Sequence, residues 1–266
     1  MGLKPDREQD IDHARFDGLA AIVTGAASGI GRATALLLAQ QSARVLVADL
    51  DEPGMAKTIE AIVSSGGIAA AQPLDVTSES AWVTAIERVE VTWGKLSILI
   101  NCAGIAFVRS VAETTLDEWR RILAVNLDGV FLGTRAGIQA MRRSGGGSIV
   151  NVASASGIKA AANSSAYCAS KSGVIMFTKA AALECVQDGI RINAVAPGGV
   201  KTPMWGKTPG ADAMVGSEIW NAPSGASIGK RFAEPIEVAR VISFLASSEA
   251  SYLTGSVVPV DAGYTA

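Results

Sequence analysis

The sequence predicts one doubly wound α/β domain, with a seven-stranded parallel sheet and helices on both of its faces. Short apolar runs alternate with helical patterns along the whole chain, which is the order that strand–helix–strand units produce. The apolar runs are nearly continuous, as expected for strands buried on both faces. No change of composition divides the 266 residues, so we expect a polar tail over 1–15 and one domain over 16–266.

The individual elements follow from the same patterns. Strands are expected at the apolar runs 19–24, 44–49, 68–74, 96–101, 148–153, 190–196 and 256–260. Helices are expected between them, at 29–42, 53–65, 79–93, 115–141, 165–188 and 235–247. The stretch 203–230 breaks this alternation because glycine and proline recur in it.

Composition and charge exclude several classes of partner. Hydrophobic residues make up 49% of the chain and charged residues 18%, which favours an ordered core. The formal net charge of −2, without a basic block, argues against nucleic acid. No apolar run reaches the roughly 18 residues of a membrane span, and the charged segment 1–16 does not look like a signal peptide. The cysteines show no paired spacing, so we expect buried thiols and a cytoplasmic protein; they are Cys102, Cys168 and Cys185.

The only histidine, His13, lies in the polar tail. A Ser-His-Asp triad would therefore lack its base, and a zinc alcohol dehydrogenase would lack its ligands. We accordingly expect no metal site. Neither Ser154 nor Ser156 lies in a G-x-S-x-G elbow.

A glycine-rich segment follows the first expected strand and opens the first helix. Its spacing is G-x-x-x-G-x-G, which fits the general dinucleotide fingerprint only loosely. Glycines let the backbone approach a pyrophosphate, and the helix N-terminus offers unpaired N–H groups. The segment predicts a Rossmann-type cofactor site, and the alternative is a purely structural turn. The expected contacts are Gly25, Ser28, Gly29, Ile30 and Gly31.

Asp49 ends the second expected strand, 18 residues beyond Gly31. A carboxylate there accepts the adenosine ribose hydroxyls and repels a 2′-phosphate. Neither Ser28 nor Leu50 supplies a cation for that phosphate, and Arg32 already belongs to the helix. The sequence therefore favours NAD over NADP, with Asp49 and Leu50 as contacts.

Tyr167 and Lys171 are spaced one helical turn apart near the start of an expected helix. An ammonium near a phenol favours the phenolate, so we expect a lowered pKa for Tyr167 and an acid/base role. Lys171 would tune this pKa and could hold the nicotinamide ribose. By itself the spacing is equally that of an ordinary helix pair.

Further segments occur in a recognisable order. They are Asp75-Val76, Asn101-Cys102-Ala103-Gly104, Asn126 within Val125-Asn126-Leu127, Ser154 placed 13 residues before Tyr167, and Pro197-Gly198 followed by Val200 and Thr202. With the glycine-rich turn and the Tyr-x-x-x-Lys pair, they resemble the short-chain dehydrogenase/reductase family over about residues 17–266. The resemblance implies that several of these residues contact the cofactor together with Tyr167 and Lys171: Asp75, Val76, Asn101, Ala103, Gly104, Pro197, Gly198, Val200 and Thr202.

The resemblance also implies a reaction, the interconversion of a secondary alcohol and a ketone at a CH–OH group by hydride transfer with nicotinamide C4. Ser154 would donate a hydrogen bond to the substrate oxygen, and Tyr167 would move the proton. Lys171 and Asn126 would continue a proton path through water. Ser156 rivals Ser154 by composition, but the 13-residue offset favours Ser154. Cys102 departs from the family, which usually has asparagine there, and this puts local rigidity in doubt.

The substrate is less defined than the reaction. Substrate contacts are expected from Ser154, Ser156, Tyr167, Met204 and Trp205, with 203–230 as a substrate lid or, alternatively, a surface helix. The candidate walls are mostly apolar, which favours an uncharged alcohol, cyclic or steroid-like; they further include Ile105, Phe107, Ala155, Ile158, Gly199 and Trp220.

Two other functions stay open. One is a 3-oxoacyl-thioester reductase using NADPH, since several cations could serve an acidic carrier: Arg109, Lys159, Lys201 and Lys207. The other is a non-catalytic dinucleotide-binding regulator. The resemblance further implies a homotetramer, with the helices 115–141 and 165–188 between subunits.

Overall fold

The computed structural model describes residues 12, 14–204 and 231–266. The described strands are β1 (Ala20–Thr24), β2 (Arg44–Asp49), β3 (Ile68–Pro73), β4 (Ile98–Asn101), β5 (Gly147–Val152), β6 (Ile190–Pro197) and β7 (Val257–Val260). The described α-helices are α1 (Gly29–Gln40), α2 (Glu52–Ser64), α3 (Glu79–Trp93), α4 (Leu116–Leu123), α5 (Gly129–Ser144), α6 (Ser165–Cys185) and α9 (Pro235–Ala246). Most bounds lie within two residues of those predicted.

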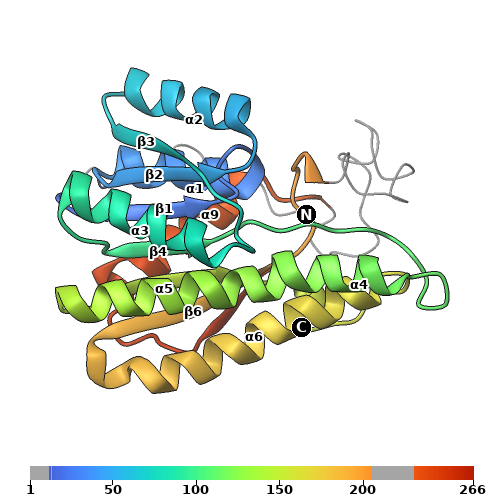
Figure 1. Cartoon of the computed structure of the whole chain (residues 1–266). Coiled ribbons are helices and arrows are strands. Elements are labelled where there is room, and N and C mark those ends of the chain that lie inside the picture. Colours follow the sequence, from blue (N-terminus) through green and yellow to red (C-terminus); the bar gives the residue numbers. More distant parts are fainter. Residues whose placement is uncertain (1–11, 13, 205–230) are drawn as a thin grey trace.

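The strands form one parallel sheet in the order β3-β2-β1-β4-β5-β6-β7 (Figure 1). This confirms the predicted doubly wound fold. The strand order reverses at β1, which has β2 on one side and β4 on the other. β1 and β4 pair in the register Val23↔Ile100. In such sheets a crevice opens at this reversal, outside the carboxyl ends of the strands. The segments that follow β1 and β4 therefore border the place where a ligand is expected.

Each face of the sheet is buried under helices, as the continuous apolar strands require. Along β1, Val23 joins the cluster formed with α1, α2 and α9, whereas Ile22 joins the cluster formed with α3, α5 and α6. Both side chains are fully buried. Burying one such side chain contributes about 1.5–3 kcal/mol, so both layers stabilise the sheet that carries the site.

The expected single helix over 115–141 is wrong in one respect. A capping box between Thr115 and Glu118 starts α4, but a π-helical turn, Ala124–Asp128, then separates α4 from α5. The fully buried side chain of Asn126 lies in this turn and bonds to the backbone of Ile105. A π turn admits one extra residue and often marks a functional position. The apolar spacing did not reveal it because helical periodicity continues on both sides.

The structure also bears on cysteines, metals and membranes. All three cysteines are free. Within the described ranges, no three histidine, cysteine or acidic side chains gather as a possible metal site. In those same ranges, no helix combines the length and the apolar character needed to cross a bilayer.

Candidate active site

The turn between β1 and α1 leaves backbone rather than side chains at the crevice. Gly25 and Gly29 have φ values of +67° and +54°, a region that L-residues rarely adopt. A Cβ on Gly31 would collide with the carbonyl oxygen of Gly25. Ser28 precedes α1 in an extended conformation, and its side chain caps none of the described N–H groups of the first turn. These N–H groups and the helix dipole fit the pyrophosphate of a dinucleotide.

A second predicted cofactor segment lies against this turn. A Cβ on Gly29 would be 3.1 Å from Cγ2 of Thr202, so the turn and the chain after β6 meet. The N–H of Gly198 donates to the Val260 carbonyl at 3.1 Å, and Val200 forms a bridge with Ala233. Pro197–Thr202 therefore crosses the carboxyl end of the sheet. Met204 ends this described stretch, and the predicted contact Trp205 lies outside the described residues.

Thr24 holds the chain after β4 in place. Its hydroxyl oxygen accepts the N–H groups of Cys102 and Ala103, at 3.0 and 3.1 Å. A Cβ on Gly25 would be 3.0 Å from Ala103, so the two segments are in close contact. The presence of Cys102 put the rigidity of this segment in doubt. The hydrogen bonds from the backbone N–H groups of Cys102 and Ala103 to the Thr24 hydroxyl hold the segment in place instead. Burial raises the pKa of the Cys102 thiol to about 12, against the opposing charge of Lys171, so the thiol is neutral at pH 7.

Asp49 lies at the carboxyl end of β2, beside the glycine-rich turn. Its carboxylate accepts the N–H of Ala27 at 3.0 Å, and those of Leu50 and Asp51 at 2.7 and 3.0 Å. Leu50 is 69% exposed next to it. The carboxylate is therefore fixed where the turn and the second strand meet.

The residues after β3 are fixed by their own turn. The carboxylate of Asp75 accepts the N–H and the hydroxyl of Thr77, at 2.9 and 2.8 Å. Val76 is buried, and its carbonyl accepts the indole N–H of Trp82 at 3.0 Å. These residues border the same edge of the sheet, and their contact with adenine stays a prediction.

Asn101 and Gly104, both predicted cofactor contacts, have different surroundings. The amide of Asn101 donates to Thr134 at 3.2 Å and to Asn151 at 2.9 Å, deep between the sheet and the helices. A Cβ on Gly104 would instead lie 3.2 Å from Oδ1 of Asn126 and 3.5 Å from Nζ of Lys171. Gly104 thus borders the catalytic candidates, whereas the side chain of Asn101 belongs to the protein interior.

Asn126 fixes the loop that leaves Gly104. Its Oδ1 accepts the N–H of Ile105 at 2.8 Å, and its Nδ2 donates to the Ile105 carbonyl at 2.9 Å. Nδ2 also lies 3.2 Å from the hydroxyl of Ser170, on α6. The hydroxyl of Ser170 donates to the carbonyl of Tyr167 at 2.8 Å. One buried asparagine therefore joins the β4 loop to the helical turn of the predicted acid/base.

Lys171 is buried beneath this cluster. Its Nζ donates to the Val152 carbonyl at 2.8 Å, and burial lowers its pKa from 10.5 to about 8. An ammonium carries three donors, so this bond is compatible with a further contact to a ribose.

The expected lowering of the Tyr167 pKa is wrong for this structure. Burial raises that pKa, and the hydrogen bond with Ser154 opposes the rise only in part. The Lys171 ammonium does not offset burial, because it lies 5.8 Å from the Tyr167 ring centroid and bonds to Val152. Tyr167 is therefore a neutral phenol at pH 7, ready to donate a proton.

Ser154, rather than Ser156, bonds to the Tyr167 hydroxyl. The Oγ of Ser154 also accepts the backbone N–H of Ser156 at 3.1 Å. Four predicted catalytic residues, Asn126, Ser154, Tyr167 and Lys171, thus lie in one connected cluster. Sequence reasoning missed Ser170, although its position three residues after Tyr167 was the available signal.

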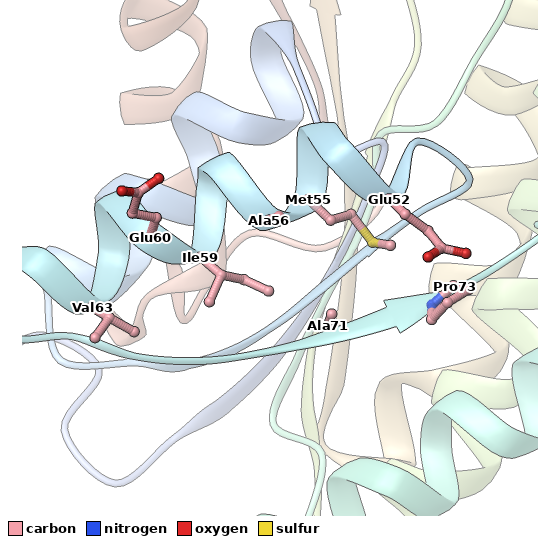
Figure 2. Close-up of a pocket in the computed structure, with 8 residues that line it drawn as sticks. All are labelled: Glu52, Met55, Ala56, Ile59, Glu60, Val63, Ala71 and Pro73. Atoms are coloured by element: carbon pink, nitrogen blue, oxygen red, sulfur yellow. The ribbon is translucent and has the colours of Figure 1, made fainter.

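A separate open groove lies between α2 and the edge strand β3 (Figure 2). Figure 2 shows Ile59 and Val63 of α2 pointing toward the strand. None of the catalytic candidates lines it; the residues that do are Glu52, Met55, Ala56, Ile59, Glu60, Val63, Ala71 and Pro73. The groove is thus distinct from the cluster around Tyr167.

Comparison with known proteins identifies the architecture and chemistry together. Residues 25–265 match a family model described as enoyl-(acyl carrier protein) reductase. The chain is 42% identical to a cyclohexanol dehydrogenase of Acinetobacter sp. (strain SE19), over 94% of this chain and 96% of that protein. It is 39% identical to a cyclopentanol dehydrogenase of Comamonas sp. (strain NCIMB 9872), over 95% of this chain and 99% of that protein. The chain belongs to the short-chain dehydrogenase/reductase family. It is thus an oxidoreductase that interconverts alcohol and ketone at CH–OH groups, as predicted.

The fold agrees with this assignment. A short-chain type dehydrogenase/reductase from Mycobacterium marinum superposes with a TM-score of 0.87 at 33% identity, covering 96% of this chain and 98% of that one. Relatives also include a 3-oxoacyl-[acyl-carrier-protein] reductase FabG of Thermotoga maritima, 38% identical over 94% of this chain and 98% of that protein. An NADP-dependent (R)-specific alcohol dehydrogenase of Lentilactobacillus kefiri is 38% identical, over 95% of this chain and 98% of that protein. The family binds NAD(P), but its members differ in which form they use and in substrate.

Proposed function

We propose that the protein interconverts an uncharged cyclic secondary alcohol and its ketone, with NAD as cofactor. The observation that carries this proposal is the similarity to cyclohexanol and cyclopentanol dehydrogenases. Of the four cations that could serve an acidic carrier, three already have partners, and Lys207 lies outside the described residues. Arg109 lies 3.3 Å from Glu118, Lys201 lies 2.6 Å from Glu234, and the ammonium of Lys159 donates to a backbone carbonyl at 3.0 Å. Exposed pairs of this kind are worth about 1 kcal/mol or less, so they lower the affinity for an acidic carrier only by that amount. The similarity to cyclohexanol and cyclopentanol dehydrogenases supports a ring-shaped substrate.

The residues of the cluster divide the chemistry among them. Ser154 donates a hydrogen bond to the substrate oxygen, where negative charge develops. Tyr167 donates the proton in ketone reduction and accepts it in alcohol oxidation. Lys171 and Asn126 carry the proton onward through water, and the bound nicotinamide supplies the hydride chemistry. Because the pKa of Tyr167 is raised, oxidation requires deprotonation of a phenol that is neutral at pH 7.

The preference for NAD rests on Asp49. Its carboxylate is held beside Ala27 at the end of β2, and its neighbours Ser28 and Leu50 carry no positive charge. A 2′-phosphate there would meet a negative charge at close range. Asp49→Ala should narrow the ratio of kcat/KM between NAD and NADP by roughly tenfold, equivalent to about 1.4 kcal/mol. An unchanged ratio would refute the ribose role of Asp49.

The second candidate is reduction of a 3-oxoacyl thioester with NADPH. It is favoured by the FabG relative, and the description of the matching family model likewise names an acyl-carrier-protein substrate. A panel of cyclopentanol, cyclohexanol, their ketones and acetoacetyl-CoA, each with both cofactors, decides between them by NAD(P)H absorbance. We expect kcat/KM for the cyclic pairs with NAD(H) to exceed that for acetoacetyl-CoA by at least about tenfold. The reverse order would replace the proposal, and tight NAD binding without turnover would favour a regulator.

We also propose a cytoplasmic homotetramer in which α4, α5 and α6 lie between subunits. Large apolar side chains on these helices are exposed, which is typical of surfaces that bind a partner. They include Leu116 and Trp119 on α4, Phe131 on α5, and Met176 and Leu183 on α6. Light scattering after size-exclusion chromatography tests the assembly, and a monomer at micromolar concentration would exclude it. The substrate lid over 203–230 stays a prediction.

A further inference from the structure

The residues after β7 fold into a compact turn, Asp261–Ala266. The carboxylate of Asp261 accepts the N–H groups of Gly263 and Thr265, each at 3.0 Å, and the Thr265 hydroxyl at 2.6 Å. Ala262 has a φ of +52°, which a side chain makes unfavourable. The carboxylate bonds compensate this strain. The turn is therefore an ordered element with a defined shape.

One side chain ties this turn to the loop that follows Ser154. The ammonium of Lys159 donates to the Tyr264 carbonyl at 3.0 Å and lies 4.8 Å from the centroid of the Tyr264 ring. A cation over an aromatic face adds to the hydrogen bond. The backbone N–H of Lys159 donates to the Ala155 carbonyl at 2.9 Å, so the loop is itself closed. We call the Lys159–Tyr264 pair the clamp.

Both ends of the clamp border the candidate active site. On one side, a Cβ on Gly198 would be 3.0 Å from Asp261, so the turn lies against the predicted cofactor segment. On the other side, the loop holds Ser156, whose N–H donates to Ser154, and Ile158, whose side chain is 46% exposed. The clamp thus joins the cofactor side of the site to a predicted substrate wall.

We infer that Lys159 is a positioning residue that, through Tyr264, fixes the 155–159 loop and so sets the ring size that the substrate site accepts. The lysine acts through the loop and touches neither cofactor nor substrate. Lys159 keeps its positive charge, because its partners are a carbonyl and a ring rather than an acid. The inference about ring size rests on the proposed function, whereas the inference that the clamp orders the loop does not.

Lys159→Met removes the charge and the donor and keeps the stem. We expect KM for cyclohexanol to rise about two- to fivefold, matching the strength of an exposed cation–π contact. We also expect an unchanged KM for NAD, a kcat close to wild type, and kcat/KM for cyclooctanol relative to cyclohexanol to increase as the wall loosens. Lys159→Arg should restore the wild-type profile, because guanidinium provides both contacts. The matched control is Lys57→Met, on the exposed face of α2.

Hydrogen–deuterium exchange over 155–164 separates the two claims. It should be faster in Lys159→Met and in Tyr264→Ala, and unchanged in Tyr264→Phe and Lys57→Met. If the wild type turns over no cyclic alcohol but exchange responds as expected, the proposed function fails and the clamp stands. If exchange and the ring-size profile are both unchanged in Lys159→Met, the clamp has no positioning role. A loss of kcat that is equal for all rings would likewise overturn the assignment of specificity.

Discussion

Two buried polar networks, each centred on an asparagine, lie within this molecule and face different surroundings. The inner network links Asn101 to Thr134 and Asn151, and links Asn151 to Thr178 at 2.9 Å. The site network links Asn126 to Ile105 and Ser170. Both asparagines are almost fully buried. The inner network contacts only the sheet and its helices, whereas the site network is bonded to the turn that carries Tyr167.

The difference teaches how the same residue type serves stability in one place and chemistry in another. In the inner network, side chains bond to one another across β4, β5 and two helices. The Oδ1 atom of Asn101 is nevertheless buried with no hydrogen-bond partner among the described residues. In the site network, the asparagine bonds to backbone and to a serine that bonds to Tyr167. Removing a member should therefore lower stability in the first network and catalysis in the second.

Tyr167→Phe should have the largest effect, because it removes the hydroxyl that we propose transfers the proton to the substrate. We expect kcat to fall about 10²- to 10⁴-fold, the usual contribution of acid/base catalysis. Cofactor affinity, measured by NADH fluorescence titration, should stay within about twofold because the ring is kept. Tyr252→Phe is the matched control, since Tyr252 is fully exposed. Substantial residual turnover in Tyr167→Phe would refute the acid/base role of Tyr167.

The pH dependence of the wild type sharpens the same assignment. Because the pKa of Tyr167 is raised by burial, the phenol stays protonated through neutral pH. Oxidation, which needs the basic form, should therefore gain kcat/KM as pH rises from about 7 to about 10, whereas reduction should stay level. Initial rates in both directions test this, and a level oxidation profile would contradict it.

Asn126→Ala and Asn151→Ala test the comparison directly. In Asn126→Ala the 104–105 loop and the Tyr167 turn lose their link, so kcat should fall about 10- to 100-fold. In Asn151→Ala the partners Asn101 and Thr178 stay buried without their bonds. The free energy of unfolding should fall by about 1–3 kcal/mol, with kcat within about twofold below the melting range. Urea unfolding and kcat are measured for both variants. If both variants lose stability and kcat to the same extent, the two networks do not differ in role.

The fold was predictable because its determinants are local. Continuous apolar strands and helical spacing identify seven parallel strands, and burial of β1 on both faces bears this out. The π turn at Asn126 was not predictable, because one extra residue in a helical turn leaves the apolar spacing on either side unchanged. Asn126 in this turn bonds to Ile105, about twenty residues away in sequence, and periodicity does not encode such a tertiary contact.

The site was predictable as a set of positions more than as a set of roles. Motif order identified Ser154 and Tyr167, which the fold brings into contact. The direction of the Tyr167 pKa could not be read from the Tyr-x-x-x-Lys spacing, because burial and the 5.8 Å separation from Lys171 are tertiary properties. The clamp between Lys159 and Tyr264 was also hidden, since its partners are 105 residues apart.

Lys171→Met should show that a lysine buried beside the site network, and proposed as catalytic, lowers the stability of the folded protein. The pKa of Lys171 falls from 10.5 to about 8 on folding, so the buried ammonium destabilises the folded state. Below about pH 8 this penalty is complete, and between pH 8 and 10.5 it disappears because the folded protein releases the proton first. The free energy of unfolding of the variant should therefore be about 1–3 kcal/mol higher than that of the wild type at pH 7. Chemical unfolding at several pH values checks this, and a gap that persists above pH 10.5 would refute it.

Ser170→Ala should have the smallest effect, because it removes a link of the site network while leaving the groups that meet the substrate. Asn126 keeps both bonds to Ile105, but the helical turn of Tyr167 loses the hydroxyl that holds its carbonyl. We expect kcat to fall about three- to tenfold with KM unchanged, as for one lost hydrogen bond of about 1 kcal/mol. Ser144→Ala, at the end of α5, is the control because its hydroxyl bonds only to carbonyls of its own helix. An equal loss in both variants would mean that Ser170 merely stabilises its helix, whereas a loss confined to Ser170→Ala makes it a positioning residue for Tyr167.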